Sequence, residues 1–168
     1  VKKNDGKSFY EFEYRYTAYF FQHLYDLKGK HEWFWERIEK YSSAIQRTLK
    51  IRKSVKMNYK GYLYCHLPRE AVDYVLNYVK IHKDYIRGLK YCSVGEEFFF
   101  QNILMNSSLK EQIQNDTLIY DEWGKRGNPA FLDETDIEKL KASKALFARK
   151  VGKRNRIVWD TIREEYHF

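Results

Sequence analysis

The feature that most constrains the fold is a run of apolar residues at helical spacing between residues 31 and 53. Its apolar side chains stand four, three, four and four residues apart: Phe34, Ile38, Tyr41, Ile45 and Leu49. This spacing returns to one side of a helix with 3.6 residues per turn, so it predicts an amphipathic helix. The other face is predicted to be basic, from Arg37, Lys40, Arg47, Lys50, Arg52 and Lys53.

Proline and glycine mark further elements in the first two thirds of the chain. Residues 9–28 partly alternate, which predicts an extended segment with one side formed by Tyr10, Phe12, Tyr14 and Tyr16. A short strand is expected in residues 57–67, and a helix is expected to start at Pro68, because proline suits the first helical position. The predicted buried stripe of that helix is Ala71, Val72, Val75, Leu76 and Val79.

The remaining residues predict two more helical segments and then a mixed C-terminal part. A short helix in 83–91 should end near Gly88, and Gly95 should open a helix with apolar positions at Phe99, Phe100, Ile103 and Leu104. A strand is expected in 117–123, a loop in 124–129, a capping box at Thr135–Glu138 and a terminal helix in 157–166. The predicted fold class is therefore α/β, in a single domain over residues 1–168.

Composition favours an anionic partner. The 168 residues carry a net charge of +8, and 18% of them are aromatic. Such a basic chain suits nucleic acid, anionic lipid or phosphorylated small molecules. The chain has no GxGxxG or GxxxxGK[ST] motif and no Cys/His cluster, so neither a nucleotide-binding fold of those types nor a zinc site is expected. Cys65 and Cys92 are expected to be reduced thiols.

Two adjacent acids, Glu96 and Glu97, stand directly before three phenylalanines. Acids at a helix start gain about 0.3–1 kcal/mol from the helix dipole, which explains both residues without any function. The alternative is a general base, which requires one acid to be partly desolvated by the neighbouring rings.

Basic and aromatic residues near the C-terminus also have two interpretations. Lys150 and Arg149 follow the apolar residues 145–147, and Lys125 and Arg126 lie in a glycine-flanked loop. They are either ordinary solvated cations or ligands for a phosphate. Trp123 could pack in a core or stack on a sugar ring. The five histidines show no metal-ligand spacing.

Four ordered blocks resemble a known enzyme family: GYLYCHLPREAVDYVL, GEEFFFQNILMNS, LIYDEW and LFARKV, within residues 59–151. In this order they are similar to the C-terminal half of the core-2/I-branching β-1,6-N-acetylglucosaminyltransferases, a family that also includes the peptide O-xylosyltransferases. The resemblance implies part of a GT-A-like fold and an inverting transfer from a UDP-sugar to a glycan hydroxyl. It also implies catalysis without a metal or another cofactor.

The resemblance assigns roles by residue. Glu97 matches the general base and Lys150 matches the lysine that binds the donor diphosphate. Arg126 is its expected arginine partner, with Lys125 second and Arg149 adjacent. The expected acceptor-binding residues are Glu96, Tyr62 and Trp123.

The sequence departs from the family pattern in two respects. Tyr62 follows Gly61 where relatives often have serine, which puts the identity of the acceptor in doubt. The chain is expected to begin partway through the catalytic domain, so this part alone is expected to be inactive or weakly active. The donor sugar is expected to be N-acetylglucosamine, with xylose as the alternative. A cytoplasmic bacterial enzyme at the inner face of the membrane is expected.

Two other classes of function stay open. A basic aromatic nucleic-acid-binding module agrees with the charge and the aromatic content, although no RRM, KH or helix-turn-helix signature occurs. A peripheral membrane module agrees with the helix expected in 31–54, whose apolar and basic faces are typical of an interfacial helix.

Overall fold

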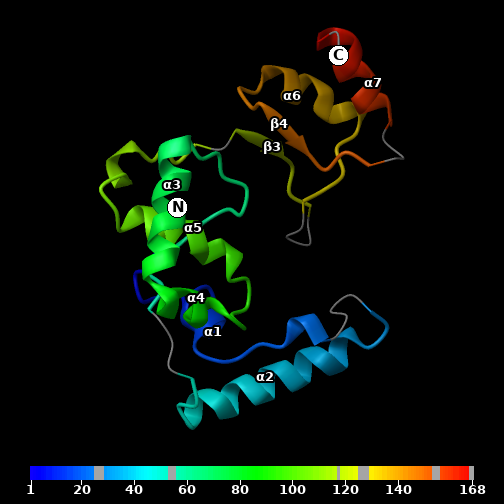
Figure 1. Cartoon of the computed structure of the whole chain (residues 1–168). Coiled ribbons are helices and arrows are strands. Elements are labelled where there is room, and N and C mark those ends of the chain that lie inside the picture. Colours follow the sequence, from blue (N-terminus) through cyan, green and yellow to red (C-terminus); the bar gives the residue numbers. More distant parts are fainter. Residues whose placement is uncertain (25–28, 53–55, 117, 125–128, 153–155, 167–168) are drawn as a thin grey trace. The chain divides into compact units, whose positions relative to one another are not determined.

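The computed structural model describes residues 1–24, 29–52, 56–116, 118–124, 129–152 and 156–166 (Figure 1). The chain divides into two compact units, Val1–Gln114 and Asn115–Phe168. Both units combine helices with short strands, which agrees with the α/β prediction at that coarse level. The single domain over residues 1–168 stays a prediction. Among the described residues, no helix is both long and apolar enough to cross a membrane.

The first unit is mainly helical. Its described elements are β1 (Lys2–Lys3), α1 (Glu13–Tyr16), a 3-10 turn (Gln22–Leu24), α2 (Glu32–Thr48), β2 (Tyr59–Lys60), α3 (Arg69–Ile81), α4 (Lys83–Leu89), α5 (Glu96–Met105) and a second 3-10 turn (Lys110–Gln112). The two strands pair antiparallel, with Lys2 opposite Lys60. The strand predicted in 57–67 is thus real but only two residues long.

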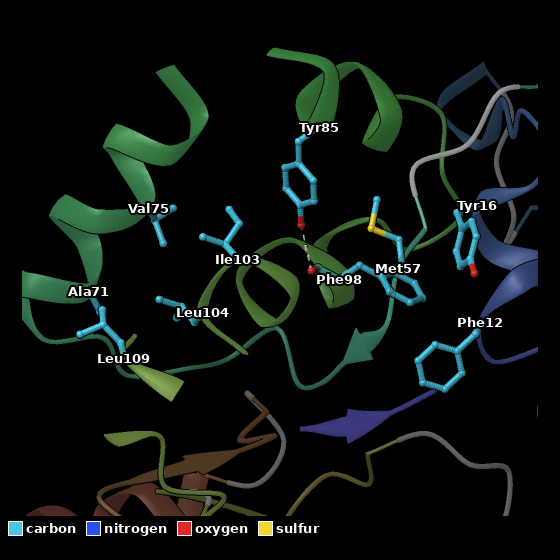
Figure 2. Close-up of a cluster of buried hydrophobic side chains, with 10 residues drawn as sticks. All are labelled: Phe12, Tyr16, Met57, Ala71, Val75, Tyr85, Phe98, Ile103, Leu104 and Leu109. Carbon is cyan, nitrogen blue, oxygen red and sulfur yellow. Dashed lines mark hydrogen bonds between the residues drawn. The ribbon is translucent and has the colours of Figure 1, made fainter. Parts of the chain in front are cut away.

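Helix α5 lies at the centre of the core of this unit (Figure 2). It is apolar on most sides, which is typical of a helix surrounded by other elements. Around its Phe98, Ile103 and Leu104 pack buried side chains from the N-terminal segment, from α3, from α4 and from the residues before β2 and after α5: Phe12, Tyr16, Met57, Ala71, Val75, Tyr85 and Leu109. The Tyr85 hydroxyl donates to the carbonyl of Phe99 at 2.8 Å, so the buried phenol is satisfied.

Helix α3 confirms the predicted helix but corrects two details. Pro68 has an extended backbone and is the N-cap, one residue before the first helical position. Ala71 and Val75 are buried, whereas Val72 and Leu76 are 36% and 51% exposed. The buried side is shifted because the tyrosines of α3 also pack against the core, and their large rings occupy the side next to Ala71 and Val75.

The extended segment predicted in 9–28 is wrong for residues 13–16 and 22–24, which are helical. Residues 13–16 form a helical turn, and Phe12 and Tyr16 are buried on one side because they stand four residues apart. Tyr10 is 70% exposed. Phe12 and Tyr16 stand four residues apart, a spacing that puts them on one side of a strand and also on one side of a helix. The pattern alone therefore does not distinguish the two structures.

Helices α2, α4 and α5 begin and end close to the predicted positions. α4 ends at Leu89, and α5 starts at Glu96 with Gly95 as its N-cap. α2 ends at Thr48, so the predicted basic face does not extend to Arg52, which is buried. Lys53 lies outside the described residues.

The second unit contains a parallel strand pair that the sequence did not predict as such. β3 (Ile119–Asp121) pairs with β4 (Phe147–Arg149), and Ile119 lies opposite Phe147. The connection contains a 3-10 turn (Glu134–Asp136) and α6 (Ile137–Ala142), and α7 (Arg156–Tyr166) follows. The capping box is formed by Asp133 and Asp136, not by Thr135 and Glu138, because the chain enters its helical conformation two residues earlier.

Candidate active site

The first turn of α5 distinguishes the two adjacent acids. Glu96 is exposed, whereas the Glu97 side chain is only 33% exposed. The Glu97 backbone N–H donates to the carbonyl of Val94 at 3.0 Å, which holds the turn at the helix start. Of the two acids, Glu97 is therefore the one with restricted hydration, as a general base requires.

A lysine from β2 faces this carboxylate. Lys60 Nζ lies 3.0 Å from Glu97 Oε2, and the Lys60 side chain is 23% exposed. The backbone N–H of Gly61 donates to the Glu97 carbonyl at 2.9 Å, so β2 lies directly along the start of α5. The two opposite charges are partly shielded from water, which strengthens their attraction relative to a surface pair.

Asn102 fixes β2 against α5. Its Oδ1 accepts from the backbone N–H groups of Asn58 and Tyr59 at 2.7 and 3.0 Å. Its Nδ2 donates to the carbonyls of Tyr59 and Phe98 at 2.6 and 2.9 Å. One buried amide thus substitutes for the hydrogen bonds that a neighbouring strand would make, and it sets the position of Lys60.

Gln101 lies one helical turn after Glu97 on the same side of α5. Its Nε2 donates to the Tyr62 carbonyl at 2.8 Å. Gln101 Oε1 and Glu97 Oε2 are both buried and accept no hydrogen bond within the described residues, although Lys60 Nζ forms an ion pair with Glu97 Oε2. Buried acceptors without donors are uncommon.

Position 61, next to Gln101, leaves little room for a side chain. A Cβ atom at Gly61 would lie 2.9 Å from Gln101 Cγ, which is closer than van der Waals contact allows. The Tyr62 side chain that follows is 43% exposed. Glu96, Glu97 and the Tyr62 backbone thus lie around the start of α5. Sequence reasoning missed Lys60, Gln101 and Asn102, although two amide side chains inside the apolar run of α5 were an available signal.

The predicted donor-binding residues belong to the second unit. The Lys150 carbonyl accepts from Leu132 N–H at 2.8 Å, and Lys150 Nζ lies 5.9 Å from the ring centroid of Phe131. Arg149 ends β4 opposite Asp121. Trp123, which was expected to bind the acceptor, also belongs to this unit and is 55% exposed. Lys125 and Arg126 lie outside the described residues.

A polar network in the second unit was not predicted. The Tyr120 hydroxyl donates to Glu122 Oε1 at 2.7 Å, and Lys139 Nζ lies 3.1 Å from the same oxygen. Lys139 also lies 3.5 Å from Asp136 Oδ1. The hydrogen bond from Tyr120, followed by the Lys139 ammonium, lowers the pKa of Glu122, and burial together with Glu122 raises the pKa of Tyr120. This network connects the β3 segment to α6.

Both cysteines are free thiols, and burial raises the pKa of each. No group of three or more His, Cys, Asp or Glu side chains in the described part of the chain is arranged to hold a metal ion. Comparisons with protein-family models, with curated proteins and with solved structures found no match. The assignment of a function therefore depends on the sequence blocks and on the chemistry of these side chains.

Proposed function

We propose that this protein is an inverting glycosyltransferase with a GT-A-like fold. It transfers N-acetylglucosamine from a UDP-sugar to a glycan hydroxyl without a metal ion, with xylose as the alternative donor sugar. The observation that supports this proposal best is the partly shielded carboxylate of Glu97 at a helix start, paired with Lys60 at 3.0 Å. A carboxylate with restricted hydration is suited to deprotonating a sugar hydroxyl.

In the proposed reaction, Glu97 accepts the proton of the acceptor hydroxyl as its oxygen attacks the anomeric carbon. The new carbon–oxygen bond forms as the bond from that carbon to the diphosphate breaks, and the bonding electron pair leaves with UDP. Attack from the opposite face inverts the configuration. The proton stays on the Glu97 carboxyl until it passes to solvent, and general base assistance of this kind accelerates reactions by about 10²–10⁴-fold.

Lys60 and Gln101 have supporting roles on the acceptor side. The Lys60 ammonium, 3.0 Å from Glu97 Oε2, holds the carboxylate in one orientation, so Lys60 is a positioning residue. Gln101 holds the Tyr62 backbone beside α5, because its Nε2 donates to the Tyr62 carbonyl at 2.8 Å. Glu96, Tyr62 and Trp123 are the further acceptor contacts in this proposal.

On the donor side, cations neutralise the charge that develops on the leaving UDP. Lys150 and Arg149, with Arg126 and Lys125 of the neighbouring loop, bind the diphosphate by charge-assisted hydrogen bonds. The backbone of Lys150 is held by hydrogen bonds in both directions, from Leu132 N–H to its carbonyl and from its own N–H to Ala130. Its ammonium is therefore carried by a fixed stretch of chain.

The test is transfer from UDP-N-acetylglucosamine and UDP-xylose, in EDTA, by the protein expressed in its full reading frame. Glu97→Gln should lose at least about a hundredfold in kcat. Glu70→Gln is the matched control, because Glu70 is also the second residue of a helix in the first unit and is exposed. Equal rates for Glu97→Gln and wild type would exclude Glu97 as the base. An absence of turnover with either donor, together with salt-dependent oligonucleotide binding, would favour the nucleic-acid-binding alternative.

A further inference from the structure

Helix α2 contacts the rest of its unit through its polar side. Ser43 is fully buried although the apolar residues of the helix are not. Gln46 forms two hydrogen bonds with the backbone of Tyr19: its Oε1 accepts from the N–H at 2.8 Å and its Nε2 donates to the carbonyl at 3.2 Å. An amphipathic helix on the surface of a globular unit normally docks with its apolar side instead.

Two more contacts involve the same polar side. Gln22 Nε2 donates to both carboxylate oxygens of Glu39, at 3.1 and 3.0 Å. The Arg47 guanidinium lies 4.7 Å from the ring centroid of Tyr14 and 5.5 Å from that of Phe9. Figure 1 shows the segment that follows α1 running alongside α2, in agreement with these contacts.

The apolar stripe therefore points away from the unit. At 100° per residue the stripe is centred roughly opposite Ser43. Its members are between 42% and 67% exposed and none belongs to the core cluster: Phe34, Ile38, Tyr41, Ile45 and Leu49. Five large apolar side chains in one continuous row on a surface indicate an interaction site rather than scattered exposure.

Most charged residues of α2 lie on the half of the helix that includes Ser43. They are the acids Glu32, Glu36 and Glu39 and the basic residues Lys40 and Arg47. The charged residue that borders the stripe is Arg37, whose guanidinium lies 5.7 Å from the Trp33 ring centroid. Arg37 forms no salt bridge with any residue that the structure describes. The outward half thus carries no acid and a single cation at its edge, Arg37, in a chain of net charge +8.

We propose that α2 is an interfacial helix that binds an anionic lipid surface, with the stripe inserted at the boundary between headgroups and acyl chains. A row of large apolar side chains with Arg37 and no acid at its edge matches such a surface in both polarity and charge. Tyr41 in the stripe is 67% exposed, and tyrosine favours the membrane–water interface.

Vesicle flotation tests the proposal, with the full protein and two sets of vesicles: phosphatidylcholine alone, and phosphatidylcholine with phosphatidylglycerol. Wild type should float with the anionic vesicles and bind the neutral ones more weakly. Ile38→Glu with Ile45→Glu should weaken anionic binding at least tenfold, because a carboxylate resists insertion. Ile81→Glu is the matched control, since Ile81 is 75% exposed in the same unit and lies outside the stripe. Circular dichroism checks that both variants keep their helices.

Three results would overturn the proposal. Wild type could fail to bind anionic vesicles. The stripe variant could bind them as wild type does, in which case the net charge alone causes binding. The protein could form a dimer in sedimentation that the stripe variant abolishes, in which case a second copy covers the stripe.

Discussion

Removal of the Arg52 guanidinium should destabilise the first unit more than any other single substitution of a charged residue there. Arg52 is 7% exposed and it donates to four backbone carbonyls, those of Ala18, Gly88, Lys90 and Tyr91. It thereby joins the segment after α1 to the connection between α4 and α5.

The magnitude follows from the carbonyls that would be left without a donor. Ala18 and Gly88 are buried, so water cannot replace the lost hydrogen bonds there. Each hydrogen bond from a charged group contributes about 1.5–3 kcal/mol, so these two bonds together give about 3–6 kcal/mol for Arg52→Met. Domains of this size are stable by only about 5–15 kcal/mol, so much of the stability is at risk.

Urea denaturation followed by circular dichroism measures this loss. With an m-value of about 2 kcal/mol/M, the midpoint should fall by roughly 1.5–3 M. Arg69→Met is the matched control, because the Arg69 side chain is 89% exposed and its ion pair with Asp73 is a surface pair. That variant should stay within about 0.5 kcal/mol of wild type. A loss below about 1 kcal/mol for Arg52→Met would refute the reasoning, because the desolvation of the buried cation would then cancel its hydrogen bonds.

Three further predictions concern the candidate site and the second unit. Lys60→Met should lower kcat in the transfer assay about tenfold without unfolding the protein, and Lys60→Arg should restore part of the rate if the cation positions the base. Asn102→Ala should cost about 2–4 kcal/mol in urea denaturation, since it leaves buried backbone groups unpaired, while the exposed Asn77→Ala should cost under about 0.5. The hydrogen bond from Tyr120 lowers the pKa of Glu122 in the folded state. The ionised Glu122 carboxylate therefore stabilises the fold above its unfolded pKa, and this stabilisation is lost as the pH falls through its folded pKa. Wild type should accordingly be more stable than Glu122→Gln at pH ~7 but not at pH ~3.

Local patterns predicted the longer helices well but not the helical turn at 13–16. Pro68 and Gly95 mark the starts of α3 and α5, because each acts on the backbone next to it, and α4 ends one residue after Gly88. The side that a helix buries depends on segments far away in the sequence. The tyrosines of α3 shifted its buried side, and α2 keeps its predicted helix but docks through Gln46 and Ser43.

In the candidate site, too, local patterns were predictable and contacts between distant residues were not. Glu97 was selected by resemblance to an enzyme family, and its half-buried position at a helix start agrees with the geometry that role needs. Lys60 was not selected, because its approach to Glu97 depends on hydrogen bonds between residues about 40 positions apart, such as those of Asn102 with Tyr59. A pattern along the chain cannot show such pairs. Lys125 and Arg126 lie outside the described residues, so their role stays a prediction.

In the first unit, buried polar side chains pair backbone groups that the strands of a sheet pair in many α/β proteins. Its described strands have only two residues each, so few of its backbone groups can be paired by a sheet. Asn102 and Gln101 bind the β2 segment to α5, and Arg52 binds carbonyls at the end of α4 and in the connection that follows it. Each such side chain fixes several backbone groups at once, because amides and guanidinium groups carry several donors. The segment that presents Lys60 is therefore held in register with Glu97 by side chains, and this pairing would preorganise the carboxylate before any substrate binds.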